Sequence, residues 1–159
     1  MATHRHATKS TMIESRVFVD TNVLIYARDV SAGEKWLVAQ RWLDRLASND
    51  RMVVNLQVLN ELTRWVLRNE KVPLDVARER IDLMREFGEG SIELSDVDRA
   101  WDVRAKLGYQ WFHCLLIAAA ANEGCTHFLS EDMGHETRYG DLTIINPFRV
   151  DPDAFFKAN

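Results

Sequence analysis

Short apolar runs alternate along the chain with longer segments in which apolar residues recur at every third or fourth position. The short runs are too brief for helices and rich in β-forming residues, so they predict the strands of a sheet. They lie at residues 17–19, 52–54, 92–94, 126–129 and 142–145. The periodic segments predict helices, because their apolar residues fall on one helical face. They cover residues 34–47, 56–69, 73–87, 95–107 and 111–121, and a short helical turn is predicted at 22–27.

This alternation of strands and helices predicts an α/β fold with a parallel sheet covered by helices on both faces. Right-handed crossovers place the carboxyl ends of all the strands at one edge of the sheet. Asp20 follows the first predicted strand, and Asp132 follows the fourth. If these two strands are central neighbours, the carboxylates converge where the chain reverses direction, which is where such sheets bind ligands. Glu61 lies early in the predicted helix at 56–69, near the carboxyl end of the strand that precedes this helix. It is therefore poised to join the two aspartates.

Each of these acidic residues also has a simpler interpretation. Asp20 alone could be a turn or capping residue, and a glutamate on a helix such as Glu61 is most often a solvated surface charge. Asn22 and Asn55 are suited to cap the helices that follow them. Ser95 with Asp98 resembles a capping box for the helix at 95–107. The functional interpretation therefore depends on several acids meeting in one place.

Carboxylates that share a cleft raise one another's pKa, because like charges repel. A hard divalent cation removes this conflict, and Mg²⁺ and Mn²⁺ prefer carboxylate and water oxygens. Such an ion can activate water and stabilise the charge on a leaving oxygen of a phosphodiester. The sequence contains no Gly-rich phosphate loop and no arrangement typical of acyl transfer. A metal-dependent hydrolase with acidic ligands is the chemistry that these residues favour.

Composition and charge narrow the class of protein. The 159 residues suffice for one domain, and 47% hydrophobic with 28% charged residues is ordinary for a globular protein. With a net charge of −4 the protein lacks the overall positive charge of many nucleic-acid-binding proteins. Local clusters of basic residues could still contact phosphates. No apolar run approaches the roughly 20 residues that span a bilayer. Two cysteines in different contexts predict buried thiols in a reducing compartment, so we expect a cytoplasmic protein with no membrane contact.

Four stretches make the sequence resemble PIN-domain ribonucleases, and in particular the VapC-type toxins of VapBC toxin–antitoxin systems. They are VFVDTNVLIYA at 17–27, NLQVLNE at 55–61, FLSEDM at 128–133 and IINPF at 144–148. The resemblance implies a three-layer fold with a five-stranded parallel sheet of order 3-2-1-4-5. We expect this domain at residues 15–150, between a flexible N-terminal tail at 1–14 and a C-terminal tail at 151–159.

The resemblance also implies an activity, a cofactor and partners. The activity is endonucleolytic cleavage of RNA, either transfer RNA or another structured RNA, at a Mg²⁺ or Mn²⁺ site. The partners are a VapB-like antitoxin and a second copy of the chain in a homodimer. By position, the candidate catalytic residues are Asp20, Glu61, Asp132 and His113, with the three acids as metal ligands. The candidate supporting residues are Thr21, Asn22, Ser130 and Glu131.

His113 departs from the family pattern. It precedes the run CLLIAAAA at 114–121, where the family usually has an aspartate, so a negative charge is lost and a nitrogen replaces an oxygen ligand. His113 could ligate Mn²⁺ or a softer metal, act as a base, weaken the metal site, or be an engineered substitution. The alternative function is therefore a catalytically weakened PIN module that binds RNA or an antitoxin. His127 and His135 are expected to be structural or exposed.

Overall fold

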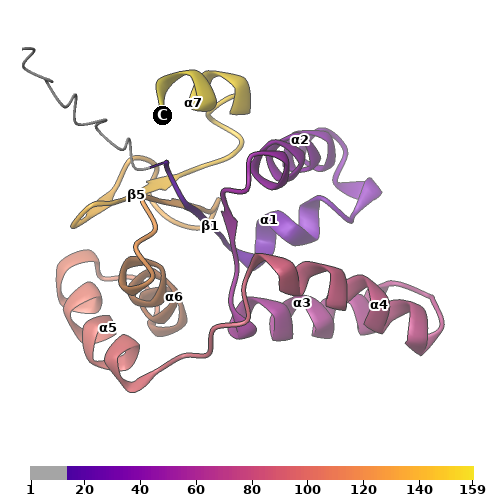
Figure 1. The fold of residues 1–159 in the computed structure, drawn as a ribbon, viewed down its shortest axis with the longest axis horizontal. Coiled ribbons are helices and arrows are strands. Elements are labelled where there is room, and N and C mark those ends of the chain that lie inside the picture. Colours follow the sequence, from indigo (N-terminus) through magenta and orange to yellow (C-terminus); the bar gives the residue numbers. More distant parts are fainter. Residues whose placement is uncertain (1–13) are drawn as a thin grey trace, which may run out of the picture.

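The computed structural model describes residues 14–159 (Figure 1). Apart from Glu14, the predicted N-terminal tail lies outside the described residues. Five strands form one sheet of order β2-β1-β3-β5-β4. They are β1 (Val17–Val19), β2 (Met52–Val53), β3 (His127–Leu129), β4 (Arg138–Tyr139) and β5 (Leu142–Ile145). All neighbours pair in parallel except β4, which runs antiparallel to β5. The predicted α/β class is confirmed.

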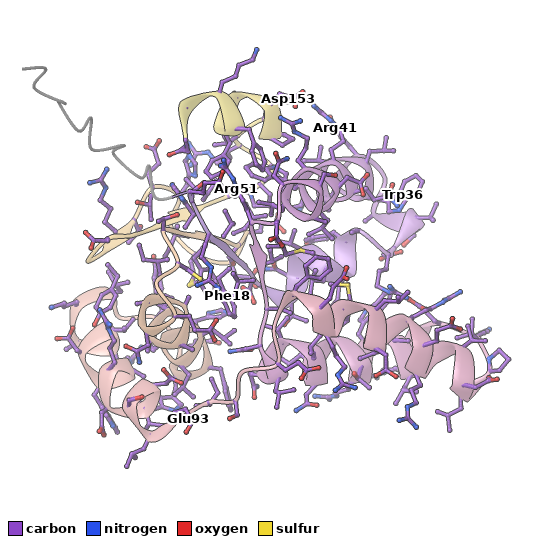
Figure 2. The ribbon with its side chains drawn as sticks, viewed as in Figure 1. Phe18, Trp36, Arg41, Arg51, Glu93 and Asp153 are labelled. Atoms are coloured by element: carbon purple, nitrogen blue, oxygen red, sulfur yellow. The ribbon has the colours of Figure 1, made fainter. Side chains whose placement is uncertain are left out.

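The strands that precede Asp20 and Asp132 are central neighbours, as expected. Residue Val19 of β1 pairs with Leu129 of β3, and the Asp20 N–H donates to the Leu129 carbonyl over 3.0 Å. Phe18 and Phe128 stack at 5.1 Å between ring centroids, and Phe18 lies at the middle of the molecule in Figure 2. This fully buried aromatic pair holds the two strands side by side. Because the strands are parallel, the residues that follow each of them lie at the same edge of the sheet.

Helices cover both faces of the sheet. Figure 1 shows α2 and α7 on one side of the strands and α5 with α6 on the other. The α-helices are α1 (Thr21–Tyr26), α2 (Glu34–Ser48), α3 (Leu56–Asn69), α4 (Leu74–Met84), α5 (Leu94–Leu107), α6 (Trp111–Asn122) and α7 (Pro152–Ala158). Two 3₁₀ turns occupy Val30–Ala32 and Arg85–Phe87. Every helix among residues 14–159 is too short or too polar to cross a membrane.

Residues 92–94 do not form the expected outer strand, so the predicted order 3-2-1-4-5 is wrong at its first position. Leu94 instead begins α5, and the Asp96 side chain accepts the N–H of Glu93 over 2.9 Å. The capping pair is therefore Glu93 and Asp96, and the expected pair Ser95 and Asp98 is wrong. The outer edge of β2 is occupied by residues 87–90, whose carbonyls accept the N–H groups of Val54 and Leu56.

Gly88 allows this close approach. Its φ is +145°, and a Cβ built there would lie 2.1 Å from the Val54 carbonyl oxygen. The fifth strand is β4 at the opposite edge, formed by a hairpin that turns through Gly140 and Asp141. The inner run of four parallel strands agrees with the sequence, and only the outer strand differs.

The C-terminal segment packs against α2. The Trp42 indole N–H lies 2.9 Å from the Pro147 carbonyl oxygen and 3.2 Å from that of Val150. Phe155 of α7 is buried against the Trp42 ring. Arg41 pairs with Asp153, and Figure 2 shows the two side by side. Both cysteines, Cys114 and Cys125, are buried and free, as predicted.

Candidate functional site

Asp20 stands at the carboxyl end of β1 and caps α1. Its Oδ1 accepts the N–H of Thr21 over 2.8 Å, and its Oδ2 accepts the hydroxyl of Ser130 over 2.8 Å. The side chain is buried. Burial raises the pKa of Asp20 above its ordinary value, although the Ser130 hydrogen bond and the nearby His113 lower it in part. Asp20 is thus both the helix cap and a carboxylate held at the edge of the sheet. Asn22, which we expected to cap α1, lies inside that helix.

Ser130 and Asn22 connect Asp20 to the second acid. The Ser130 hydroxyl also accepts the backbone N–H of Asp132 over 3.2 Å. Asn22 donates from Nδ2 to the Asp132 carboxylate over 2.7 Å. Asp132 is exposed to solvent, and its hydrogen bonds with Asn22 and Ser130 hold it in position. Ser130 and Asn22, two of the predicted supporting residues, thus both contact the acids.

His113 joins the two aspartates. One ligand atom each from Asp20, His113 and Asp132 lies within 4.8 Å of the other two. His113 is the third residue of α6, and the helix beyond it is buried from Cys114 through Ala120 with few breaks. A helix fixed in the core therefore places the imidazole at the same edge of the sheet as both carboxylates.

Glu61 is connected to this group but is not one of its three members. Its Oε2 accepts the hydroxyl of Thr21 over 2.7 Å, and its Oε1 accepts from Gln57 over 3.0 Å. Asn55 caps the helix that carries Glu61, as predicted, by accepting the Val58 N–H over 3.0 Å. Glu61 thus reaches Asp20 through the single residue Thr21.

Glu131 takes part in a different cluster. Its carboxylate accepts hydrogen bonds from Lys35 and Tyr26, and Lys35 lies 5.0 Å from the Tyr26 ring centroid. Burial alone would raise the pKa of Glu131, but the hydrogen bonds from Lys35 and Tyr26 outweigh it and hold the pKa below its ordinary value. Of the two acids in the motif, the structure directs Asp132 to His113 and Asp20, and it directs Glu131 to Lys35.

The other two histidines outside the N-terminal segment lie apart from the group. His135 accepts the Asn146 N–H at Nδ1 over 3.1 Å, and His127 packs edge-on against Phe155. Burial lowers the pKa of His127. Both have structural contacts, which agrees with the sequence interpretation.

An open groove of about 800 Å³ lies along α3, and Glu61 is one of the residues that line it. Arg64 and Arg68 line it and are exposed, and Phe112, which is 64% exposed, lines it beside His113. Within residues 14–159 neither arginine takes part in an ion pair, whereas six other arginines of that range do. In the sequence these arginines are recognisable only as part of a cluster of basic residues. Their spacing of four on one helix places them on one face, but nothing in the sequence shows that this face is next to Glu61.

The residues present fit a divalent cation. Two carboxylates and an imidazole supply oxygen and nitrogen ligands at a separation that one ion can bridge. The Oδ1 of Asn22, next to Asp132, is buried and has no hydrogen-bond partner among the described residues. A polar atom in this condition is an expected contact for an ion's hydration water. Asp20, Asp132 and His113 are the side chains that would hold the ion.

A sequence model of the PIN domain matches residues 17–139, so the chain belongs to the PIN-domain family. Similar folds occur in a toxin–antitoxin complex from Klebsiella pneumoniae and in VapBC2 from Rickettsia felis bound to a DNA fragment from their promoter. The first is 15% identical with a TM-score of 0.57, covering 84% of this chain and 98% of that one. The second is 16% identical with a TM-score of 0.57, covering 80% and 96%.

A third similar structure is VapC20 from Mycobacterium tuberculosis, described as a toxin that cleaves the sarcin-ricin loop. It is 15% identical with a TM-score of 0.53, covering 73% of this chain and 91% of that one. At these identities the likeness establishes the shared fold. A comparison with curated protein sequences finds no significant match.

Proposed function

We propose that this chain is a divalent-metal-dependent endoribonuclease and the toxin of a VapC-type toxin–antitoxin pair. The observation that carries the proposal is the convergence of Asp20, Asp132 and His113 at the carboxyl edge of a PIN-domain sheet. The sarcin-ricin loop cleaving activity printed for VapC20 supports RNA as the substrate class. We propose transfer RNA or another structured RNA as the target.

The chain's own residues divide the work of phosphodiester hydrolysis. When bound, Mg²⁺ or Mn²⁺ would supply charge stabilisation for the phosphate and its leaving oxygen. Asp20 and Asp132 would hold the ion, and Ser130 and Asn22 fix the direction of their carboxylates. Glu61, which is hydrogen-bonded to Thr21 and Gln57, would contribute a further ligand or orient water.

The groove along α3 supplies the contacts that an RNA strand needs. Arg64 and Arg68 present two charges without ion-pair partners in the described chain, and phosphate oxygens are their natural ligands. The exposed Phe112 ring offers a face on which an unpaired base can stack. Because Glu61 lines the groove, a strand bound there would place a phosphate near the acidic group.

The test compares the native chain with Asp20→Asn on purified transfer and ribosomal RNA. Asp20→Asn should abolish cleavage, because it removes a ligand charge while preserving the size of the cap. Addition of a chelator should do the same to the native chain. Asp141→Asn, in the exposed turn before β5, is the matched control and should cut at the native rate. Cleavage that persists with chelator or in Asp20→Asn would contradict the proposal.

We further propose that a VapB-like antitoxin neutralises the chain, because two similar structures are toxin–antitoxin assemblies. The groove between α3 and α4 fits an apolar segment of such a partner. Leu67 and Leu74 line it and are 55% and 74% exposed. Leu74→Asp should weaken co-purification with the small protein encoded next to this chain, whereas Leu83→Asp, outside the groove, should not.

A homodimer is proposed as the state of the free toxin, and sedimentation of the purified chain tests it.

A further inference from the structure

We propose that His113 makes this centre select a first-row transition-metal dication, Mn²⁺ or a later metal such as Co²⁺ or Zn²⁺, over Mg²⁺. The inference rests on the metal centre of the proposed function and names the ion that the centre takes. It follows from the nitrogen atom that His113 contributes beside Asp20 and Asp132.

The fold commits His113 to the site. It lies in the first turn of α6, and in the turns that follow Cys114, Ile117 and Ala118 are fully buried in the core. Rotation of the helix would expose these residues, so the backbone of His113 cannot move away from the acids at low cost. The ring itself is only half-buried, so an ion can approach it from solvent.

The donor set decides between the ions. Mg²⁺ requires a nearly ideal octahedron of oxygen ligands and attracts them mainly by charge. With His113 present, the closely grouped ligand atoms come from two carboxylates and one neutral nitrogen, so both the charge and the oxygen count are lower than with a third aspartate. Imidazole nitrogen is a good ligand for Zn²⁺, Fe²⁺ and Ni²⁺, and affinity rises from Mn²⁺ through Co²⁺. The same substitution therefore weakens Mg²⁺ and favours the later ions.

The test titrates MgCl₂, MnCl₂ and CoCl₂ into the metal-free full chain by calorimetry, with no RNA present. The native chain should bind Mn²⁺ and Co²⁺ at least about tenfold more tightly than Mg²⁺, which corresponds to about 1.4 kcal/mol. His113→Asp should reduce this preference about tenfold, mainly by gaining Mg²⁺ affinity. An aspartate in the first turn of a helix is favourable, so this variant should fold. The visible absorption of bound Co²⁺ should also change when the nitrogen ligand is removed.

Two controls assign the signal to this site. His113→Asn removes the ligand without adding charge and should lose Co²⁺ affinity with no gain for Mg²⁺. Asp20→Asn should remove the site's signal, so that heat which survives it belongs elsewhere, for example to His4 and His6 near the N-terminus. An identical Mn²⁺ to Mg²⁺ ratio in the native chain and His113→Asp would overturn the inference. Metal binding by His113→Asp alone would overturn it as well, and would favour the non-catalytic binding module.

The inference and the proposed function fail separately. A native chain that prefers Mn²⁺ as expected but cuts no RNA would refute the ribonuclease and leave the ion selectivity standing. A native chain that cuts RNA and binds Mg²⁺ as tightly as Mn²⁺ would refute the selectivity and leave the ribonuclease standing.

Discussion

Thr21, the first residue of α1, hydrogen-bonds both Asp20 and Glu61. Its N–H binds the Asp20 carboxylate, and its hydroxyl binds Glu61. One buried residue thus orients two acids through its backbone and its side chain respectively. Such supporting contacts matter because a ligand held in one rotamer loses less freedom when it binds an ion.

Thr21→Val should slow RNA cleavage by about 10- to 100-fold, the usual effect of losing a contact behind a metal ligand. Valine has the shape of threonine but cannot donate to Glu61, while the backbone bond to Asp20 remains. The measurement is the single-turnover cleavage rate, with the thermal midpoint as a check on folding. Thr63→Val is the matched control, since Thr63 lies on α3 with Glu61 and its hydroxyl donates to the Leu59 carbonyl instead. Equal rates for Thr21→Val and the native chain would contradict this role.

The sequence predicts individual site residues when a strand end points to them. Asp20 and Asp132 each follow a buried strand, and parallel pairing alone brings such positions together. The contact between Thr21 and Glu61 spans 40 positions and depends on the side-chain rotamers. The split between Asp132 and Glu131 depends on Lys35, which lies 96 positions before Glu131. Contacts of this kind leave no periodic signal in the sequence.

At the scale of secondary structure, Glu70 connects three helices. It caps the carboxyl end of α3 and binds Arg28, which follows α1, and Arg80 on α4. Burial alone would raise the pKa of Glu70, but the hydrogen bonds from the two arginines outweigh it and lower the pKa. Its charged form therefore stabilises the arrangement of α1, α3 and α4.

Glu70→Gln should lower the free energy of unfolding at pH 7 by about 1–3 kcal/mol, because two arginines lose a charged acceptor. A glutamate whose pKa is lowered by folding stabilises above its unfolded pKa of about 4.3 and loses that effect as the pH falls through the folded value. The difference between the variant and the native chain should thus shrink below about pH 4. Urea unfolding at several pH values measures it.

Glu89→Gln is the control for this pair of measurements. Glu89 also binds an arginine, Arg85, but both side chains are at least half exposed. Exposed pairs contribute little, so the change should stay within about 0.5 kcal/mol. A loss as large as that of Glu70→Gln would show that burial is not the cause.

Secondary structure was predictable where periodicity is long and was not where capping competes with a short apolar run. The helices that carry Glu61 and His113 agree with their predicted ranges within a few residues. The apolar residues at both ends of 92–94 predicted a strand. In the structure the Asp96 carboxylate accepts the Glu93 N–H, and this contact caps a helix that begins at Leu94. The strand β4 has two residues and no alternation to detect. The helix α7 is stabilised by the Asp151 side chain, which caps it, and by the packing of Phe155 against Trp42 of α2.

At the scale of the whole molecule, charge is distributed unevenly. The chain carries a net charge of −4, and six arginines of residues 14–159 pair with carboxylates. Arg64 and Arg68 are not among these six, and they line the same groove as Glu61. An overall acidic protein can therefore present a local positive track to a phosphate backbone.

The double variant Arg64→Ala with Arg68→Ala should weaken binding of a labelled single-stranded RNA to Asp20→Asn protein. Each phosphate contact contributes about 0.7 to the slope of log affinity against log salt, so the slope should fall by about 1.4. Fluorescence anisotropy between low and moderate salt measures it. Arg78→Ala is the matched control, because Arg78 is exposed on α4 and pairs with Asp82. An unchanged slope in the double variant would exclude these arginines as phosphate contacts.

The irregular segment at residues 87–90 has a consequence for how copies of this protein can meet. Its carbonyls already occupy the N–H groups of Val54 and Leu56, so the backbone beside β2 offers no free template there for a foreign strand. Gly88 makes this cover possible, since a larger residue would be forced away from Val54. The segment thus protects one border of the sheet from edge-to-edge aggregation, and substitution of that glycine would weaken this protection.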